Sequence, residues 1–338
     1  MKILHSIQRE AVTDAVRAKF AMVAPVLEAT LLSVQRDRLE RLGGVATWSL
    51  ADLAREHRDG DGDTGICFEY AVHEGIARRD GLIWPLVSEV LETFCGIPTG
   101  ADSLLFGPEK EGVIPILASV QDALSDESRL YVGNRGQPPK LRRYIPQVIR
   151  AFRRQEARDN LPRSIRGLWK ADLFLGSRRV EKWVGTTVKV NAADLEGARG
   201  LRIGIYPMRT SKESPRLDTN LNLVRLPLPY DAHFMELFYK SFYLVRAFLL
   251  ADAHVPPPVR LPDAEDRYVT KELEDRRTFP LLDVLGAIRD MSQGSLLHTE
   301  KRDVSPDASL SEAEGLNGAA AERPSDYVSV TPAAQERS

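Results

Sequence analysis

The order of the helix and strand signals along this chain is the feature that most constrains its fold. Three short apolar segments, 168–175, 183–191 and 201–206, are bounded by turn residues and have the composition of strands. Helical periodicity stands on both sides of them, in 7–42 and in 230–250. The sequence therefore predicts an α/β (α+β) fold in which a small mixed sheet is flanked by helices.

Changes in composition divide the chain into three parts. A breaker of alternating Asp and Gly at 59–65 follows the first helical region, so we expect a helical N-terminal layer over 1–58. An α/β domain is expected over 59–294. From about residue 295 the chain is rich in Ser, Ala, Glu and Pro without an apolar pattern, which predicts a disordered C-terminal tail over 295–338.

Helical patterns also lie between the breaker and the strands. They predict helices over 66–79, 84–94, 112–124 and 140–158. In the last of these, we expect Pro146 to mark the start of continuous helix, because proline is favoured in the first helical turn.

The overall composition is that of a globular protein. Hydrophobic residues make up 43% of the chain and charged residues 28%. The two cysteines, Cys67 and Cys95, cannot build a disulfide scaffold or a four-cysteine zinc site. No segment approaches the roughly 18 apolar residues of a membrane span, and the first residues lack the apolar run of a signal peptide. We expect a cytoplasmic protein with no membrane partner.

An acidic residue stands inside the first apolar strand segment. Burying the Asp172 carboxylate is costly unless a metal ion or another partner compensates its charge. In the next strand Thr187 and Lys189 are two residues apart, so they share one face, while Val188 points to the other.

The connection between these two strands decides whether the polar residues meet. A wide loop centred near Val180 would put Asp172 beside Thr187 and Lys189. A tight turn at 177–178 would instead displace them by several residues.

A carboxylate beside a lysine suits phosphodiester hydrolysis. Carboxylate oxygens hold Mg²⁺, which polarises the phosphate and the attacking water. A lysine ammonium orients that water or stabilises developing negative charge. One carboxylate rarely suffices, and the best second candidate is Glu69 on the helix predicted over 66–79. His73 shares its face one turn later, and we expect it, like Cys67, to be a packed core residue.

These residues resemble the core motif of the PD-(D/E)XK superfamily, the restriction-endonuclease-like nucleases. That motif has an Asp in one strand and (Asp/Glu)-x-Lys in the next, often with a Glu on a preceding helix. Asp172 matches the first acid, Thr187-Val188-Lys189 the second motif, and Glu69 the helical glutamate. The resemblance covers about residues 65–206 and implies a restriction-endonuclease-like core.

The resemblance implies a metal-dependent DNA endonuclease. Its catalytic residues would be Asp172, Lys189, Glu69 and Thr187, with Lys189 acting on the water. Mg²⁺, or Mn²⁺ in its place, would be held by Asp172, Glu69 and the Val188 carbonyl. Thr187 stands where the family has a second acid, and its hydroxyl can hold a metal-bound water but adds no negative charge. Stand-alone members imply bacterial defence against foreign DNA, and cleavage of both strands would commonly need two sites, as in a homodimer.

Three alternatives to an active nuclease remain open. Asp172 and Lys189 could form a cross-strand ion pair on a half-exposed sheet, with Glu69 complementing its helix dipole. The chain could be a nuclease-fold protein that binds nucleic acid without cutting it. It could also be a helical adaptor whose basic helix contacts an acidic protein partner.

A basic stretch lies directly before the Asp172 strand. The whole chain has a net charge of −2, yet residues 140–170 hold ten basic residues against two acidic ones. Arg150, Arg154 and Arg158 recur every four residues and would line one helical face, as a surface for phosphates does. The alternative is a solvated face paired with acids elsewhere. The residues predicted to bind nucleic acid are Lys140, Arg142, Arg143, Arg150, Arg153 and Arg154.

The Asp-rich breaker also resembles the start of a calcium loop. Its sixth and twelfth positions are Thr64 and Tyr70, where such a loop needs Gly and Glu. We therefore expect a turn that caps the helix carrying Glu69.

Overall fold

The fold is described from a computed structural model. It covers residues 13–292 except 35, 42, 59, 99, 113–118, 134–136, 211 and 230–232. The described residues lie within one compact unit. The tail predicted over 295–338 lies outside them.

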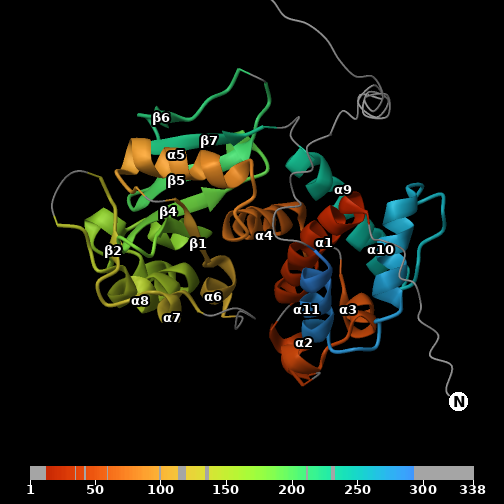
Figure 1. The fold of residues 1–338 in the computed structure, drawn as a ribbon. Helices are drawn as coiled ribbons and strands as arrows, with labels where there is room; N and C mark the ends of the chain where they lie inside the picture. Colours follow the sequence, from red (N-terminus) through yellow and green to blue (C-terminus); the bar gives the residue numbers. More distant parts are fainter. Residues whose placement is uncertain are drawn as a thin grey trace, which may run out of the picture. The chain divides into compact units, whose positions relative to one another are not determined.

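Among the described elements, helices come first and last, and most of the strands follow one another between them (Figure 1). The helices are α1 (Asp14–Ser33), α2 (Arg36–Arg41), α3 (Leu50–Glu56), α4 (Thr64–Ala77), α5 (Ile83–Cys95), α6 (Gly107–Glu111), α7 (Val120–Ala123), α8 (Leu141–Arg153), α9 (His233–Leu250), α10 (Ala264–Glu274) and α11 (Leu281–Met291). The strands are β1 (Asp102–Leu105), β2 (Arg129–Leu130), β3 (Leu173–Ser177), β4 (Lys182–Val188), β5 (Leu201–Pro207), β6 (Arg216–Asp218) and β7 (Leu223–Leu228).

The described strands form one seven-stranded sheet in the order β1-β3-β4-β5-β7-β6, with β2 paired to β4 outside this path. The β1–β3, β3–β4 and β6–β7 pairs are antiparallel. The β2–β4, β4–β5 and β5–β7 pairs are parallel. The predicted mixed sheet flanked by helices is confirmed, and the restriction-endonuclease-like core stays a prediction.

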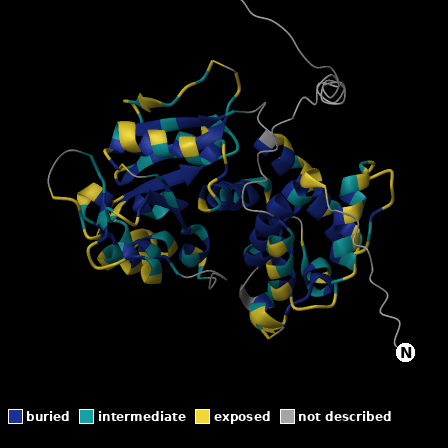
Figure 2. Cartoon of the chain, in the orientation of Figure 1, coloured by how far each residue is buried: buried dark blue, intermediate teal, exposed yellow. Residues whose placement is uncertain are grey.

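Each face of the sheet packs into its own hydrophobic cluster. Leu173 and Leu175 belong to the cluster that includes residues of α4 and α5, whereas Phe174 belongs to the cluster that includes residues of α8. This alternation is the period of two expected of a strand buried on both faces. Figure 2 shows the central strands as buried, while the edge strand β6 and the outer side of α5 carry exposed residues. Asp172 is two residues before Phe174 and lies toward the α8 face.

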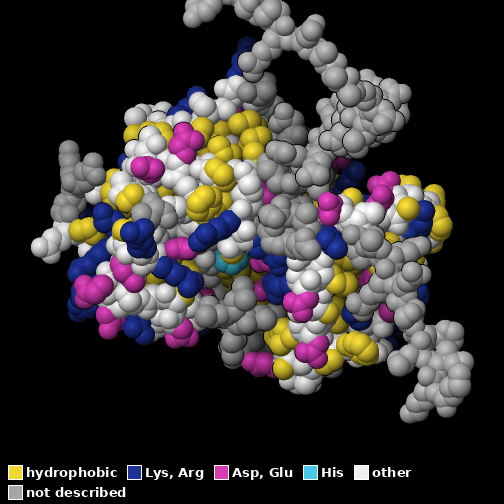
Figure 3. All heavy atoms as spheres, viewed as in Figure 1, with side chains coloured by type: hydrophobic (Ala, Val, Ile, Leu, Met, Phe, Trp, Pro, Cys, Tyr) yellow, Lys and Arg dark blue, Asp and Glu magenta, His cyan; other side chains and the backbone are white. Residues whose placement is uncertain are grey.

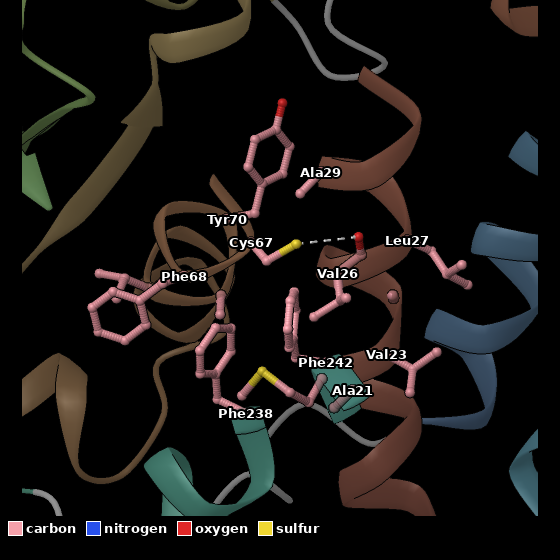
Figure 4. Close-up of a cluster of buried hydrophobic side chains, with 14 of the residues drawn as sticks. Ala21, Val23, Val26, Leu27, Ala29, Cys67, Phe68, Tyr70, Phe238 and Phe242 are labelled. Carbon is pink, nitrogen blue, oxygen red and sulfur yellow. Dashed lines mark hydrogen bonds between the residues drawn. The ribbon is translucent and has the colours of Figure 1, made fainter. Parts of the chain in front are cut away.

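Helix α4 joins the sheet to the N-terminal helices. It contacts α1 on one side and β1 and β4 on the other, and α1 also packs against α9, α10 and α11. In Figure 4, Cys67 and Phe68 of α4 lie among residues of α1 and α9. The rings of Phe68 and Phe238 are 5.2 Å apart between centroids. Cys67 is fully buried, as predicted, and burial raises the pKa of its thiol to about 12.

Two of the predicted helices differ from the observed ones. A continuous helix over 112–124 is wrong, because Gly112 has a φ of +89° and ends α6, and Ser119 begins a new helix, α7, at Val120–Ala123; residues 113–118 lie outside the described ones. Helix α8 starts at Leu141 and runs through Pro146. Pro146 has no N–H and so cannot donate one of the backbone hydrogen bonds of this helix. The free energy gained by burying Leu141 in the first turn offsets that loss.

Candidate active site

The register of the β3–β4 hairpin places the polar residues of the site together. Ser177 pairs with Lys182 and Leu173 with Thr186, so the connection is the wide loop 178–181. Asp172 therefore lies beside Thr187. The wide-loop alternative is confirmed, and the tight turn at 177–178 is excluded.

One oxygen of the Asp172 carboxylate accepts three hydrogen bonds. The donors to Oδ2 are the Thr187 hydroxyl at 2.9 Å, the Val188 amide at 3.0 Å and the Lys189 ammonium at 3.2 Å. Asp172 itself is only 7% exposed. These contacts provide the compensation that a buried carboxylate needs.

Glu69 reaches the same ammonium group from α4. Its Oε1 lies 3.6 Å from Lys189 Nζ, and its side chain is 13% exposed. Asp63 caps this helix by accepting a hydrogen bond from the Ile66 amide at 2.8 Å, as the turn prediction required. Both predicted acids therefore lie within 3.6 Å of one lysine nitrogen.

The charges in this cluster shift one another's pKa values. Burial, and then the Asp172 carboxylate, raise the pKa of Glu69 well above its usual value, although Lys189 opposes the shift. Burial lowers the pKa of Lys189, but the Asp172 and Glu69 carboxylates outweigh it and hold that pKa above its usual value. Lys189 is therefore a permanent cation at neutral pH, suited to stabilising negative charge rather than to removing a proton.

A second lysine, which the sequence did not single out, contacts Asp172 from the other side. Lys110 of α6 is 4% exposed, and its Nζ lies 3.6 Å from Asp172 Oδ1. The same nitrogen donates to the Trp169 carbonyl at 3.4 Å and lies 5.6 and 5.1 Å from the ring centroids of Phe106 and Phe152. The two carboxylate oxygens of Asp172 therefore each face a lysine.

Helix α6 is held in place by the backbone of Asp172. The amides of Phe106 and Gly107 donate to the Asp172 carbonyl at 2.9 and 3.2 Å. Lys110 lies far from Asp172 in the sequence, so no local spacing pattern could have linked the two. Only the pairing of β1 with β3 brings them together.

An open hollow lies beside this cluster. Its volume is about 310 Å³. The residues that line it are Lys110, Phe152, Trp169, Lys170, Asp172, Thr187, Lys189, Asp194, Glu196 and Leu201.

The oxygen donors of the site are chemically suited to Mg²⁺. Carboxylates and hydroxyls are hard ligands, and Mg²⁺ in proteins is often held by one or two carboxylates plus substrate phosphates and water. Within the described ranges, no group of three or more His, Cys, Asp or Glu is arranged to hold a metal ion. Asp172 and Glu69 therefore fit a metal only if substrate oxygens complete its coordination. The Val188 amide binds Asp172, and the metal role of the Val188 carbonyl stays a prediction.

The six residues predicted to bind nucleic acid fall into two groups. Lys140 and Arg142 pair with Glu127 and Asp126 at 3.1 Å each. The Arg153 guanidinium donates to the Lys110 carbonyl at 2.9 Å. In Figure 3, Lys and Arg side chains around α8 are interspersed with acidic ones. Paired cations of this kind match the alternative of a solvated face.

The second group consists of Arg143, Arg150 and Arg154, which are exposed. None of them has a charged or hydrogen-bonding side-chain partner among the residues described. The predicted continuous stripe of Arg150, Arg154 and Arg158 is wrong, because α8 ends at Arg153 and Arg154 is extended. Arg158 instead stacks on Trp169, with its guanidinium carbon 3.8 Å from the ring centroid.

The remaining candidate residues have structural roles. His73 is buried, as predicted, with Nδ1 2.9 Å from the Ser103 hydroxyl, and burial lowers its pKa to about 4. In the Asp-rich turn, Asp61 accepts two hydrogen bonds from Arg38 at 2.8 and 2.9 Å. Its carboxylate is thus already paired, as expected of a turn rather than a calcium loop.

In comparisons with known proteins, no protein-family model, no curated protein and no solved structure matches this chain. Among the described helices, none has the length and apolar content required to cross a membrane.

Proposed function

We propose that this chain is a Mg²⁺-dependent DNA endonuclease of the PD-(D/E)XK type. The observation that carries the proposal is the convergence of Asp172, Lys189 and Glu69 from three separate elements. Both carboxylates lie within 3.6 Å of the Lys189 ammonium. These three residues are not neighbours in the sequence, so their side chains meet only because the strand pairing and the position of α4 bring them together, as the motif predicted.

Each residue of the site would have its own role in hydrolysis. Asp172 and Glu69 would hold the metal ion, which when bound polarises the phosphate and acidifies a water molecule. Lys189 would place its positive charge where negative charge develops on the phosphate. Thr187 donates its hydrogen bond to Asp172, so it would position that carboxylate. Among the six predicted cations of α8 and its ends, Arg143, Arg150 and Arg154 are exposed and have no side-chain partner among the described residues, so they would contact the DNA backbone.

The test is cleavage of plasmid DNA in Mg²⁺ or Mn²⁺. We expect Asp172→Asn, Glu69→Gln and Lys189→Met each to slow cleavage by about 100-fold or more, because each removes a charge from the reacting centre. Asp159→Asn is the matched control, since Asp159 is an exposed acid that pairs with Arg166 at 3.6 Å. Cleavage that survives all three site substitutions would overturn the proposal.

One observation favours a second candidate function, binding of nucleic acid without cleavage. The site has a threonine in place of an acid, and both oxygens of Asp172 face lysines. Two lysines against two acids leave little negative charge to attract a divalent cation. Retained DNA binding with no cleavage in either metal would select this candidate. If cleavage is found, defence against foreign DNA is the biological role that the resemblance implies.

A further inference from the structure

The hollow beside Asp172 combines cations with aromatic rings. Three lysines line it, Lys110, Lys170 and Lys189, together with the side chains of Phe152 and Trp169. Its volume of about 310 Å³ lies at the lower end of the range for small-molecule sites, about 300–1,000 Å³. A hollow of this size and lining suits a planar ring that carries a negative charge.

Trp169 is held as a rigid plane beside the site. It lies in the 3₁₀ turn Leu168–Lys170, which ends two residues before Asp172, and its side chain is partly exposed. The Arg158 guanidinium stacks 3.8 Å from its ring centroid and is itself fixed by a 3.1 Å hydrogen bond to the Ala151 carbonyl. A fixed aromatic plane next to cations is the arrangement on which unpaired bases stack.

Two ammonium groups flank the Asp172 carboxylate, one at each oxygen. Lys110 Nζ lies 3.6 Å from Asp172 Oδ1, and Lys189 Nζ lies 3.2 Å from Oδ2. Each ammonium has three donor hydrogens. Lys110 is ion-paired with Asp172 and donates to the Trp169 carbonyl, and it also belongs to the lining of the hollow. A phosphate in the hollow would therefore find two lysines without any metal ion.

Two acids besides Asp172 line the hollow. Glu196 is paired with Lys170, and Asp194 is exposed. Lys110 and Lys189 are thus the cations nearest to a ligand that enters beside Asp172, and each is ion-paired with that carboxylate.

We propose that this hollow binds one nucleotide of an unpaired DNA strand, with its base against Trp169 and its phosphate at Lys110 and Lys189, and that this binding needs no metal ion. A base in a duplex is stacked and paired, so it reaches a ring inside a hollow only after it has been unstacked. The inference rests on the proposed DNA substrate and narrows it to single-stranded or frayed DNA.

The experiment is fluorescence anisotropy of a labelled short oligothymidylate and of a duplex of equal length, both in EDTA. Wild-type protein is expected to bind the single strand more tightly. Trp169→Leu should weaken single-strand binding about tenfold or more and remove the preference, whereas Trp169→Phe keeps an aromatic plane and most of the affinity. Trp84→Leu is the matched control, because Trp84 is also partly exposed with an arginine, Arg79, 5.7 Å from its ring centroid.

Lys110→Met tests the phosphate half of the inference. We expect weaker binding of the single strand and a salt dependence whose slope is smaller by about 0.7, the value for one lost phosphate contact on a single strand. An unchanged slope together with unchanged affinity would remove Lys110 from the binding site.

The outcomes separate this inference from the proposed hydrolysis. Equal affinity for duplex and single strand, or no effect of Trp169→Leu, overturns the inference even if Asp172-dependent cleavage is found. Single-strand binding that depends on Trp169 supports it, even if no variant or metal gives cleavage.

Discussion

At the residue scale, the central feature is the buried Asp172 carboxylate and the lysines that balance its negative charge. Asp172 faces Lys110 through one oxygen and Lys189 through the other, and the Lys110 side chain is only 5% exposed. Removing one member of a buried ion pair leaves the other charge without a partner. The stability of this part of the fold therefore depends on the same charges as the proposed chemistry.

We predict that Asp172→Ala lowers the free energy of unfolding by about 3 kcal/mol, because it leaves the buried Lys110 ammonium uncompensated. Adding Lys110→Met to Asp172→Ala should cost little more, since the unpaired charge is then gone. Urea denaturation of the two single variants and the double variant measures the coupling. Strictly additive effects would show that the two side chains do not interact.

The lowered pKa of His73 makes the free energy of unfolding depend on pH. Its pKa is about 4 in the folded chain, against 6.5 for an ordinary histidine, so below pH 6.5 the unfolded chain binds a proton that the folded chain does not. The stabilisation is complete above pH 6.5 and is lost as the pH falls toward 4, by about 3 kcal/mol in total. Urea denaturation of wild type and His73→Gln between pH 4 and 7 isolates the effect as their difference. A difference that does not vary with pH would contradict it.

At the element scale, the cations of α8 and its ends are of two kinds: some pair with neighbouring residues, and others are exposed and available to bind DNA. We predict that Arg150→Ala with Arg154→Ala weakens duplex DNA binding and lowers its salt slope by about 1.8, because each exposed arginine contributes about 0.9. Lys140→Ala with Arg142→Ala is the matched control, since these two cations already pair with Glu127 and Asp126. Anisotropy titrations at several salt concentrations give both slopes. Equal slopes for the two double variants would contradict a specific role for the exposed pair.

Elements with a strong local signal could be predicted from the sequence. The helices predicted over 66–79 and 84–94 correspond to α4 and α5, whose observed bounds lie within two residues of the predicted ones. The contact between Asp172 and Lys189 could also be predicted, because the register of the two strands depends only on the length of the loop that joins them. Strand β1 has only four residues and could not be recognised from its own pattern.

Strand β7 is not among the predicted strands, and it contains Pro227, a residue that argues against a strand. The structure accommodates this proline because β6 pairs only with 223–225 of β7. Pro227 therefore lies beyond the end of β6, where its missing N–H removes no hydrogen bond to that strand. Whether a proline fits in a strand therefore depends on the length of the neighbouring strand, which cannot be read from the residues around the proline.

At the scale of the whole molecule, the first and last described helices are tied to α4 by buried charges. Arg289 of α11 pairs with Glu28 of α1, and its Nε lies 3.5 Å from Glu74 of α4. Glu74 also accepts from Arg78 at 2.6 Å. Because α4 carries Glu69, these ion pairs connect the helical layer to the candidate active site.

Arg289→Met is predicted to lower the free energy of unfolding by about 3 kcal/mol, because the Glu28 side chain is 3% exposed and would lose its partner. Adding Glu28→Gln should recover part of the loss, since a neutral amide is less costly to bury. Lys240→Met is the control and should change stability by less than about 0.5 kcal/mol, because Lys240 and Glu236 are 47% and 62% exposed. A similar loss in both single variants, measured by urea denaturation, would contradict this account.

The proposed function requires that the residues assembled around Asp172 cleave DNA. The most direct measurement is the rate of plasmid cleavage in Mg²⁺ by wild-type protein and by Asp172→Asn, each shown to be folded under the assay conditions. We predict cleavage by the wild type and a rate lower by about 100-fold or more in the variant. Equal rates in the two proteins, or no cleavage by the wild type in Mg²⁺ or Mn²⁺, would contradict the proposed function.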